Sequence, residues 1–135
     1  RFDVEPQLTH FASASCEDIC SAWLREQNRA GELPVRFGEI GRFWNKQLEI
    51  DVMGPSKAMG NRPKGAIKLF GECKFGHEPV GESVLTHLDG KISQIAPEGT
   101  HERYLFAREG FSEGLEQRAQ EDRALRLVTA DRLYR

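Results

Sequence analysis

The stretch QLEIDVM, residues 47–53, decides the fold that the sequence predicts. Apolar and polar side chains alternate along it, and this period of two is typical of a strand with one buried face. The alternation predicts that the apolar side chains share one face and the carboxylates the other, namely Leu48, Ile50 and Val52 against Glu49 and Asp51.

A second acidic pattern follows the turn-rich, basic loop of residues 54–65. A strand is predicted over residues 66–75, where Glu72 and Lys74 share the face opposite Cys73. If the two strands are hairpin neighbours, three carboxylates and one ammonium group meet on a small patch: Glu49, Asp51, Glu72 and Lys74.

Helical and strand-like periods alternate along the rest of the chain. A helical apolar stripe runs from about residue 11 to Gly31, and strand-like residues continue from Val35 to Trp44. The second half predicts helices and strands in turn, over residues 84–95, 104–107, 112–119, 125–128 and 131–134. This order indicates one α/β domain, residues 1–135, with a mixed sheet flanked by helices after an irregular lead-in over residues 1–10.

The composition limits the class of protein. With 135 residues, 39% hydrophobic and 30% charged, the chain is long enough for one domain with a sizeable core. The net charge of −2 excludes a nucleic-acid binder that relies on overall basicity. Residues 34–76, however, hold 8 Lys and Arg against 4 Asp and Glu, a local charge of +4. Nucleic-acid contacts are therefore expected from the middle of the chain, from Arg42, Lys46, Arg62 and Lys64.

The sequence also indicates a compartment. No apolar run approaches the roughly 20 residues that span a bilayer, and no signal peptide is recognisable, so a cytoplasmic protein without membrane contact is expected. Three cysteines, an odd number, predict no disulfide framework and favour small buried thiols in a reducing cytosol. Because the chain begins at Arg1, a piece of a longer protein is expected. Because it lacks a GxxxxGK[ST] loop, any nucleotide hydrolysis is expected to reside elsewhere.

The acidic patch has a chemical use. Two carboxylates, here Asp51 and Glu72, with a backbone carbonyl such as that of Cys73, are the oxygen ligands that Mg²⁺ and Mn²⁺ prefer. Such an ion lowers the pKa of a bound water, and a lysine beside it, here Lys74, can orient that water and offset transition-state charge. The pattern predicts metal-assisted phosphodiester hydrolysis, with a salt-bridged surface as the alternative interpretation.

A D…ExK pattern on adjacent strands, after a helix that carries a glutamate, resembles the PD-(D/E)xK nuclease superfamily. More specifically, the C-terminal domain of archaeal-type DEXX-box ATPases is similar to this chain from about residue 11 to the end, in the stretches CEDICSAWL, GEIGRFWNKQLEIDVMG, LFGECKFGHEPV and YLFAREGFSEGLEQRAQEDRALRLVTADRLY. The resemblance implies a restriction-endonuclease-like fold and a metal-dependent nuclease acting on DNA, with RNA as the alternative substrate. It also implies an N-terminal ATPase domain as partner.

The resemblance further implies roles for single residues. Asp51 matches the metal-binding aspartate, and Glu72 and Lys74 match the acidic residue and the lysine of the (D/E)xK element. Glu17 matches the glutamate of the first helix, which can reach the site in this superfamily. Glu49 belongs to the family's E-I-D triplet and is expected to support the site. The proline of the PD pair is replaced by an isoleucine in this sequence.

Several alternatives stay open. His77, just past the predicted strand end, lies where a substrate phosphate could pass, or it is a plain loop histidine. Phe43 and Trp44 could stack bases, although half-buried strand positions are the commoner use of such a pair. The whole domain could be an inactive nuclease-like module that binds nucleic acid or forms oligomers for its ATPase.

Overall fold

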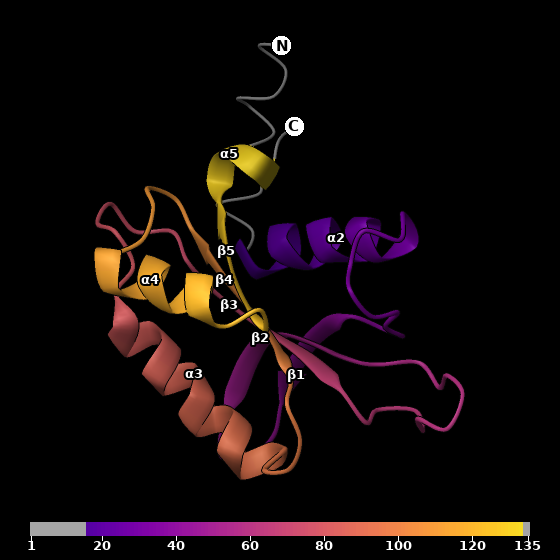
Figure 1. Cartoon of the computed structure of the whole chain (residues 1–135). Helices are drawn as coiled ribbons and strands as arrows, with labels where there is room; N and C mark the ends of the chain where they lie inside the picture. The colour runs from indigo at the N-terminus through magenta and orange to yellow at the C-terminus, as the bar shows by residue number, and fades with distance from the viewer. Residues whose placement is uncertain (1–15, 134–135) are drawn as a thin grey trace.

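The computed structural model describes residues 16–133 (Figure 1). Within this part of the chain, one sheet has the strand order β1-β2-β3-β4-β5. Its strands are β1 (Gly41–Trp44), β2 (Glu49–Pro55), β3 (Lys68–Lys74), β4 (Glu102–Ala107) and β5 (Leu125–Thr129). The pairs β1–β2 and β2–β3 are antiparallel, whereas β3–β4 and β4–β5 are parallel. The prediction of a mixed sheet is therefore confirmed.

Helices cover both faces of this sheet (Figure 1). The described helices are α2 (Cys16–Arg29), α3 (Glu82–Ile95), α4 (Glu113–Glu121) and the short α5 (Ala130–Leu133). Helix α2 lies on one face, and α3 and α4, the crossovers between the parallel strands, lie on the other. None of the described helices is long and apolar enough to cross a membrane. The predicted lead-in and the start of the first helix lie outside the described residues.

Helix ends follow local signals in the sequence. Gly31, just past the end of α2, has a φ of 77°, a left-handed conformation that glycine adopts without a Cβ penalty. At the start of α4, the Ser112 hydroxyl accepts a hydrogen bond from the Leu115 backbone N–H at 3.2 Å. This side-chain cap satisfies one of the free donors of the first turn.

Two apolar clusters hold the helices against the sheet. Leu105 of β4 belongs to the cluster under α3 and α4, and its neighbour Phe106 belongs to the cluster under α2. Both side chains are almost completely buried, so β4 is apolar on both faces. This is the pattern expected of a parallel strand in the middle of a sheet that helices cover on both sides.

The predicted faces of β2 are wrong in one respect. Ile50 packs under α3 and Val52 packs under α2, so these two side chains lie on opposite faces of the sheet. The register explains this, because Gly41 pairs with Met53 while Phe43 pairs with Ile50, which leaves one extra residue in β2. Such a bulge reverses the alternation of side chains at the position of Asp51.

The first strand is also shorter than predicted. It begins at Gly41, and Phe37 makes only an isolated bridge with Ser56. The predicted loop begins later than expected, because Pro55 still belongs to β2.

Replacing Gly54 by Ala is expected to lower the free energy of unfolding by about 1–3 kcal/mol. A Cβ at this position would lie 2.8 Å from Cγ1 of Ile40 and 3.0 Å from the carbonyl oxygen of Glu39, so the segment beside β2 would have to shift. Urea denaturation measures the change. Gly76→Ala is the control, since a Cβ there meets nothing within 4 Å. Equal destabilisation of the two variants would contradict this packing.

Candidate active site

The bulge in β2 places Asp51 at the point where β2 separates from β3. The β2–β3 ladder runs from the Val52–Gly71 pair to the Pro55–Lys68 pair. Beyond it, the Cys73 backbone N–H donates a hydrogen bond to Oδ2 of Asp51 at 2.9 Å. The Asp51 carboxylate thus accepts a hydrogen bond from a backbone N–H at the carboxyl end of β3, beyond the last pair of the β2–β3 ladder.

Glu72 is a buried acid beside Asp51. Only 5% of Glu72 is exposed. Burial, the charge of Asp51 and a hydrogen-bonding interaction with it raise the pKa of Glu72 to about 7. Burial also raises the pKa of Asp51, and the hydrogen bond from Cys73 opposes this effect. Two carboxylates that repel each other in a largely buried site would be stabilised by a bound cation.

Two lysines face this acidic pair. The charges of Lys91 and Lys74 lower the pKa of both Asp51 and Glu72, against the effect of burial. Lys91, on α3, donates a hydrogen bond to the Glu49 carbonyl oxygen at 2.7 Å. Its Nζ lies 3.7 Å from Oε1 of Glu72, beyond hydrogen-bond distance. Within the described part of the chain, this buried oxygen has no hydrogen-bond partner.

Glu17 approaches the acidic pair from the helix on the other face. It lies in the first turn of α2, and its charge contributes to the raised pKa of Asp51. Arg42 of β1 donates to Oε1 of Glu17 at 3.0 Å. The charges of Glu17 and Lys74 thus both act on Asp51, and an arginine from the edge strand adjoins Glu17.

A disulfide joins Cys16 of α2 to Cys73 of β3, with 6.6 Å between their Cα atoms. The expectation of thiols without a disulfide is therefore wrong for this pair, whereas Cys20 is a buried free thiol as expected. Cys16, Glu17 and Cys73 also group as possible metal ligands. The two sulfurs are bonded to each other, so this trio offers no thiolates to a metal.

Residues 2–85 match the DUF234 family, archaeal and bacterial proteins of unknown function. The chain belongs to this family. No curated protein and no solved structure matches the chain. The matched residues of this DUF234 chain include Glu17, Asp51, Glu72 and Lys74 and end before Lys91.

Glu49 contacts a lysine of the site through its backbone carbonyl oxygen. It is exposed at the start of β2, where it pairs with Trp44, and Lys91 binds its carbonyl oxygen. That the Glu49 carboxylate supports the site together with Asp51 stays a prediction.

His77 lies where the sequence predicted, past the end of β3. It lines a hollow of about 500 Å³ together with Lys74 and Ser83. The hollow lies at the carboxyl end of β3, and Lys74, which lines it, also acts through its charge on Asp51 and Glu72. A substrate group held in this hollow would lie next to Lys74.

Two of the four basic residues expected to contact nucleic acid, Arg42 and Lys64, line the same groove. Lys46 is exposed in the turn between β1 and β2, and Arg62 lies in a turn whose backbone pairs it with Met59. Phe43 is half-buried as expected of a strand, but Trp44 is 67% exposed, so the half-buried interpretation is wrong for the tryptophan.

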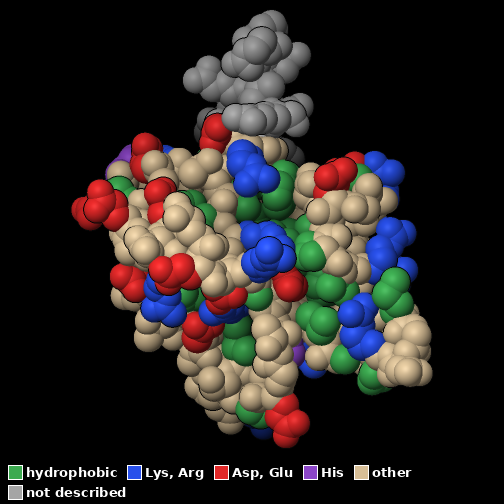
Figure 2. All heavy atoms as spheres, viewed as in Figure 1, with side chains coloured by type: hydrophobic (Ala, Val, Ile, Leu, Met, Phe, Trp, Pro, Cys, Tyr) green, Lys and Arg blue, Asp and Glu red, His purple; other side chains and the backbone are tan. Residues whose placement is uncertain are grey.

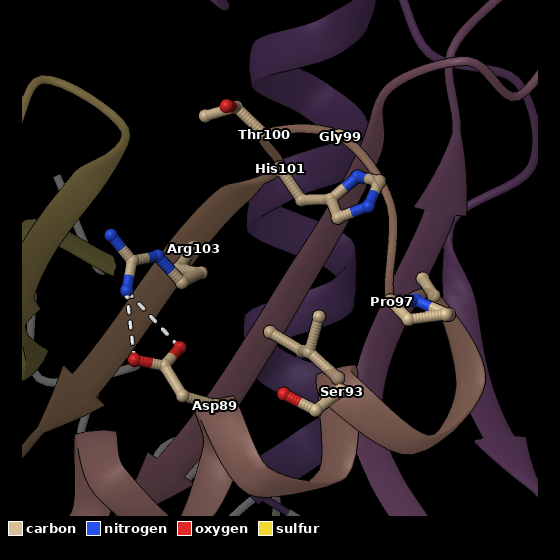
Figure 3. A pocket seen from close by; sticks show the side chains of 9 residues that line it. Asp89, Ser93, Pro97, Gly99, Thr100, His101 and Arg103 are labelled. Carbon is tan, nitrogen blue, oxygen red and sulfur yellow. Dashed lines mark hydrogen bonds and ion pairs between the residues drawn. The ribbon is translucent and has the colours of Figure 1, made fainter.

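A second hollow, of about 260 Å³, is lined by residues of α3, of the α3–β4 segment and of β4 (Figure 3). Arg103 on its wall donates to both carboxylate oxygens of Asp89. The ring of His101 accepts the Lys68 backbone N–H at Nδ1 and places Nε2 2.9 Å from the Glu98 carbonyl oxygen. Burial lowers the pKa of His101. These polar groups are engaged with the protein itself, so the hollow serves the structure.

Lys91 is the site residue that the sequence interpretation missed. It precedes the buried Ile92 and follows Leu88 by three positions, so it borders the apolar stripe of α3. A charged residue at such a border reaches the rim of the sheet with its ammonium group. The position of Lys91 at this border could have been recognised from the sequence, although nothing local in the sequence links Lys91 to Glu72.

Proposed function

We propose that this domain hydrolyses phosphodiester bonds of nucleic acid, with DNA as the preferred substrate and Mg²⁺ or Mn²⁺ as cofactor. The observation that carries the proposal is the buried Glu72 carboxyl beside Asp51, with one oxygen lacking a hydrogen-bond partner among the described residues. In this proposal the mixed sheet with helices on both faces is of the restriction-endonuclease type. The domain is then the C-terminal module of a DEXX-box ATPase.

The donor set fits a hard divalent cation. Asp51 and Glu72 would hold it, with the backbone carbonyl of Cys73 as a third oxygen ligand. Among the described residues, Oε1 of Glu72 has an ion-pair partner in Lys91 but no hydrogen-bond partner, and burial raises the pKa of both acids, so a divalent cation would stabilise their ionised forms. When bound, the ion would lower the pKa of a coordinated water and polarise a phosphoryl oxygen.

Side chains of this domain would position the water, the substrate phosphate and the metal ligands. Lys74, exposed at the end of β3, would orient the attacking water and offset negative charge that develops on the phosphoryl oxygens. His77, across the same hollow, would contact the substrate phosphate. Lys91 would hold the Glu72 carboxylate in place through its charge, and Glu17 would support a ligand or a second water.

A second candidate function is a nuclease-like module that has lost catalysis and binds nucleic acid for its ATPase. The ion pair of Arg42 with Glu17 favours it, because this contact occupies a carboxylate oxygen that the catalytic arrangement would use. The two candidates differ in whether the acidic pair supports turnover.

Cleavage assays test the proposal. Plasmid and single-stranded DNA are incubated with Mg²⁺, Mn²⁺ or EDTA, and the variants Asp51→Asn and Lys74→Met are expected to lose at least about 100-fold in rate. Glu116→Gln, an exposed change on α4, is the control and should cleave like the wild type. Cleavage that persists in both site variants would refute the proposal. A wild type that never cleaves, yet gains stability from Mn²⁺ through Asp51, would show a metal site without turnover, as the second candidate expects.

A further inference from the structure

A groove beside β1 contains more positive than negative charge. It has a volume of about 920 Å³ and runs between residues 38–43 and the β2–β3 loop. Four of its charged side chains are cations and one, Glu39, is an anion; the cations are Arg25, Arg42, Lys57 and Lys64. Lys and Arg side chains, interspersed with apolar ones, gather along the side of the molecule where this loop lies (right in Figure 2).

Hydrogen bonds to backbone atoms fix the walls of the groove before any ligand binds. Gly38 donates to the Pro55 carbonyl oxygen at 2.7 Å, and Lys57 donates to the Arg36 carbonyl oxygen at 2.9 Å. Arg25 of α2 donates to the Ile40 carbonyl oxygen at 2.9 Å, which ties the helix to the same wall. A preformed wall spares a ligand part of the entropy cost of ordering the surface.

The lining chemistry suits an unpaired nucleic-acid strand. The cations match a row of phosphates, whose neutralisation provides most of the affinity of nucleic-acid binding. The half-buried apolar side chains of Phe43, Met53 and Pro55 line the same groove. Unpaired bases can stack on such a surface, whereas the bases of a duplex are hidden between its strands.

Arg42 connects this groove to the acidic pair. The same side chain that lines the groove donates to Glu17, whose charge contributes to the raised pKa of Asp51. We infer that the groove binds a single strand of nucleic acid and leads it to the acidic pair. Lys57 and Lys64 contact its phosphates, and Phe43 contacts its bases. The role of this groove in leading a substrate to the acidic pair rests on the proposed function.

Binding without cleavage tests this inference. The affinity of a labelled oligothymidylate is measured by fluorescence anisotropy in EDTA, with Asp51→Asn as the background so that no cleavage interferes. Adding Lys57→Glu and Lys64→Glu should weaken binding at least about tenfold and reduce the salt dependence, because two phosphate contacts are lost. Arg118→Glu with Arg123→Glu, on and after α4, makes the same change in net charge away from the groove and should bind like the background.

Three outcomes would overturn the inference. These are unchanged binding by the groove variant, an equal loss in the control, and tighter binding of a duplex of the same length than of the single strand. A milder pair, Lys57→Gln and Lys64→Gln, repeats the test if the charge reversal unfolds the chain. Strand binding that needs Lys57 and Lys64 in a protein that never cleaves DNA would support the groove and refute the proposed function.

Discussion

Cys16→Ser is expected to lower the free energy of unfolding by about 4 kcal/mol. The disulfide to Cys73 spans 57 positions in the sequence, and a cross-link over such a loop removes a large conformational entropy from the unfolded chain. The loss should be read as a lower midpoint in urea denaturation under oxidising conditions.

A reductant provides the internal control for this prediction. It should lower the midpoint of the wild type to that of Cys16→Ser and leave the variant itself unchanged. Cys20→Ser removes a buried thiol that is not cross-linked, so this variant should still respond to the reductant. If the wild type and Cys16→Ser unfold at the same denaturant concentration, the disulfide does not stabilise the native chain.

The stability of the metal-free protein is expected to fall as pH rises from about 4.5 to 7, and Glu72→Gln should largely remove this fall. The pKa of Glu72 is about 7 in the native state, against 4.5 for an ordinary glutamate. The native state therefore binds more protons than the unfolded state in this window, so its stability decreases as pH rises. The effect is on the order of 3 kcal/mol, from 1.36 kcal/mol per pKa unit. The raised pKa of Asp51 acts in the same direction.

Thermal melts across this pH range, with EDTA and with Mn²⁺, measure the effect. Mn²⁺ should raise the melting temperature mainly at the upper end, because only the ionised carboxylates bind it. Glu116→Gln, with an exposed carboxylate on α4, should keep the wild-type profile. A Glu72→Gln variant with the same pH profile and the same Mn²⁺ response as the wild type would show that Glu72 neither titrates as described nor binds the ion.

Much of the fold was predictable because its signals are local. The period of two in residues 68–74, the helical stripe of α3 and the capping Ser112 each act over a few residues, so they can be recognised without the fold. The pattern of Glu72 and Lys74 was predictable for the same reason. Their shared direction depends only on the alternation within β3, which is regular.

The faces of β2 show where local reasoning fails. Strict alternation placed Ile50 and Val52 on one face, but the bulge that leaves an extra residue in β2 puts them on opposite faces, and Asp51 accepts the Cys73 backbone N–H of β3. A bulge depends on how two strands match along their length, and this match is set by the packing of both faces. The sequence interpretation thus singled out Asp51 without the bulge beside it, and the role of Asp51 as a metal ligand stays a prediction.

By itself the sequence determined the order of the strands and helices, the apolar faces that drive their packing, and the presence of an acid–x–lysine element at the end of a strand. Only the tertiary structure decided that Lys91 reaches Glu72, that Cys16 bonds to Cys73, and that Arg25 and Lys57 join Arg42 in one groove. The physical reason is the range of the interactions. Secondary structure follows from neighbours along the chain, whereas the site is made of residues that only strand register and helix packing bring together.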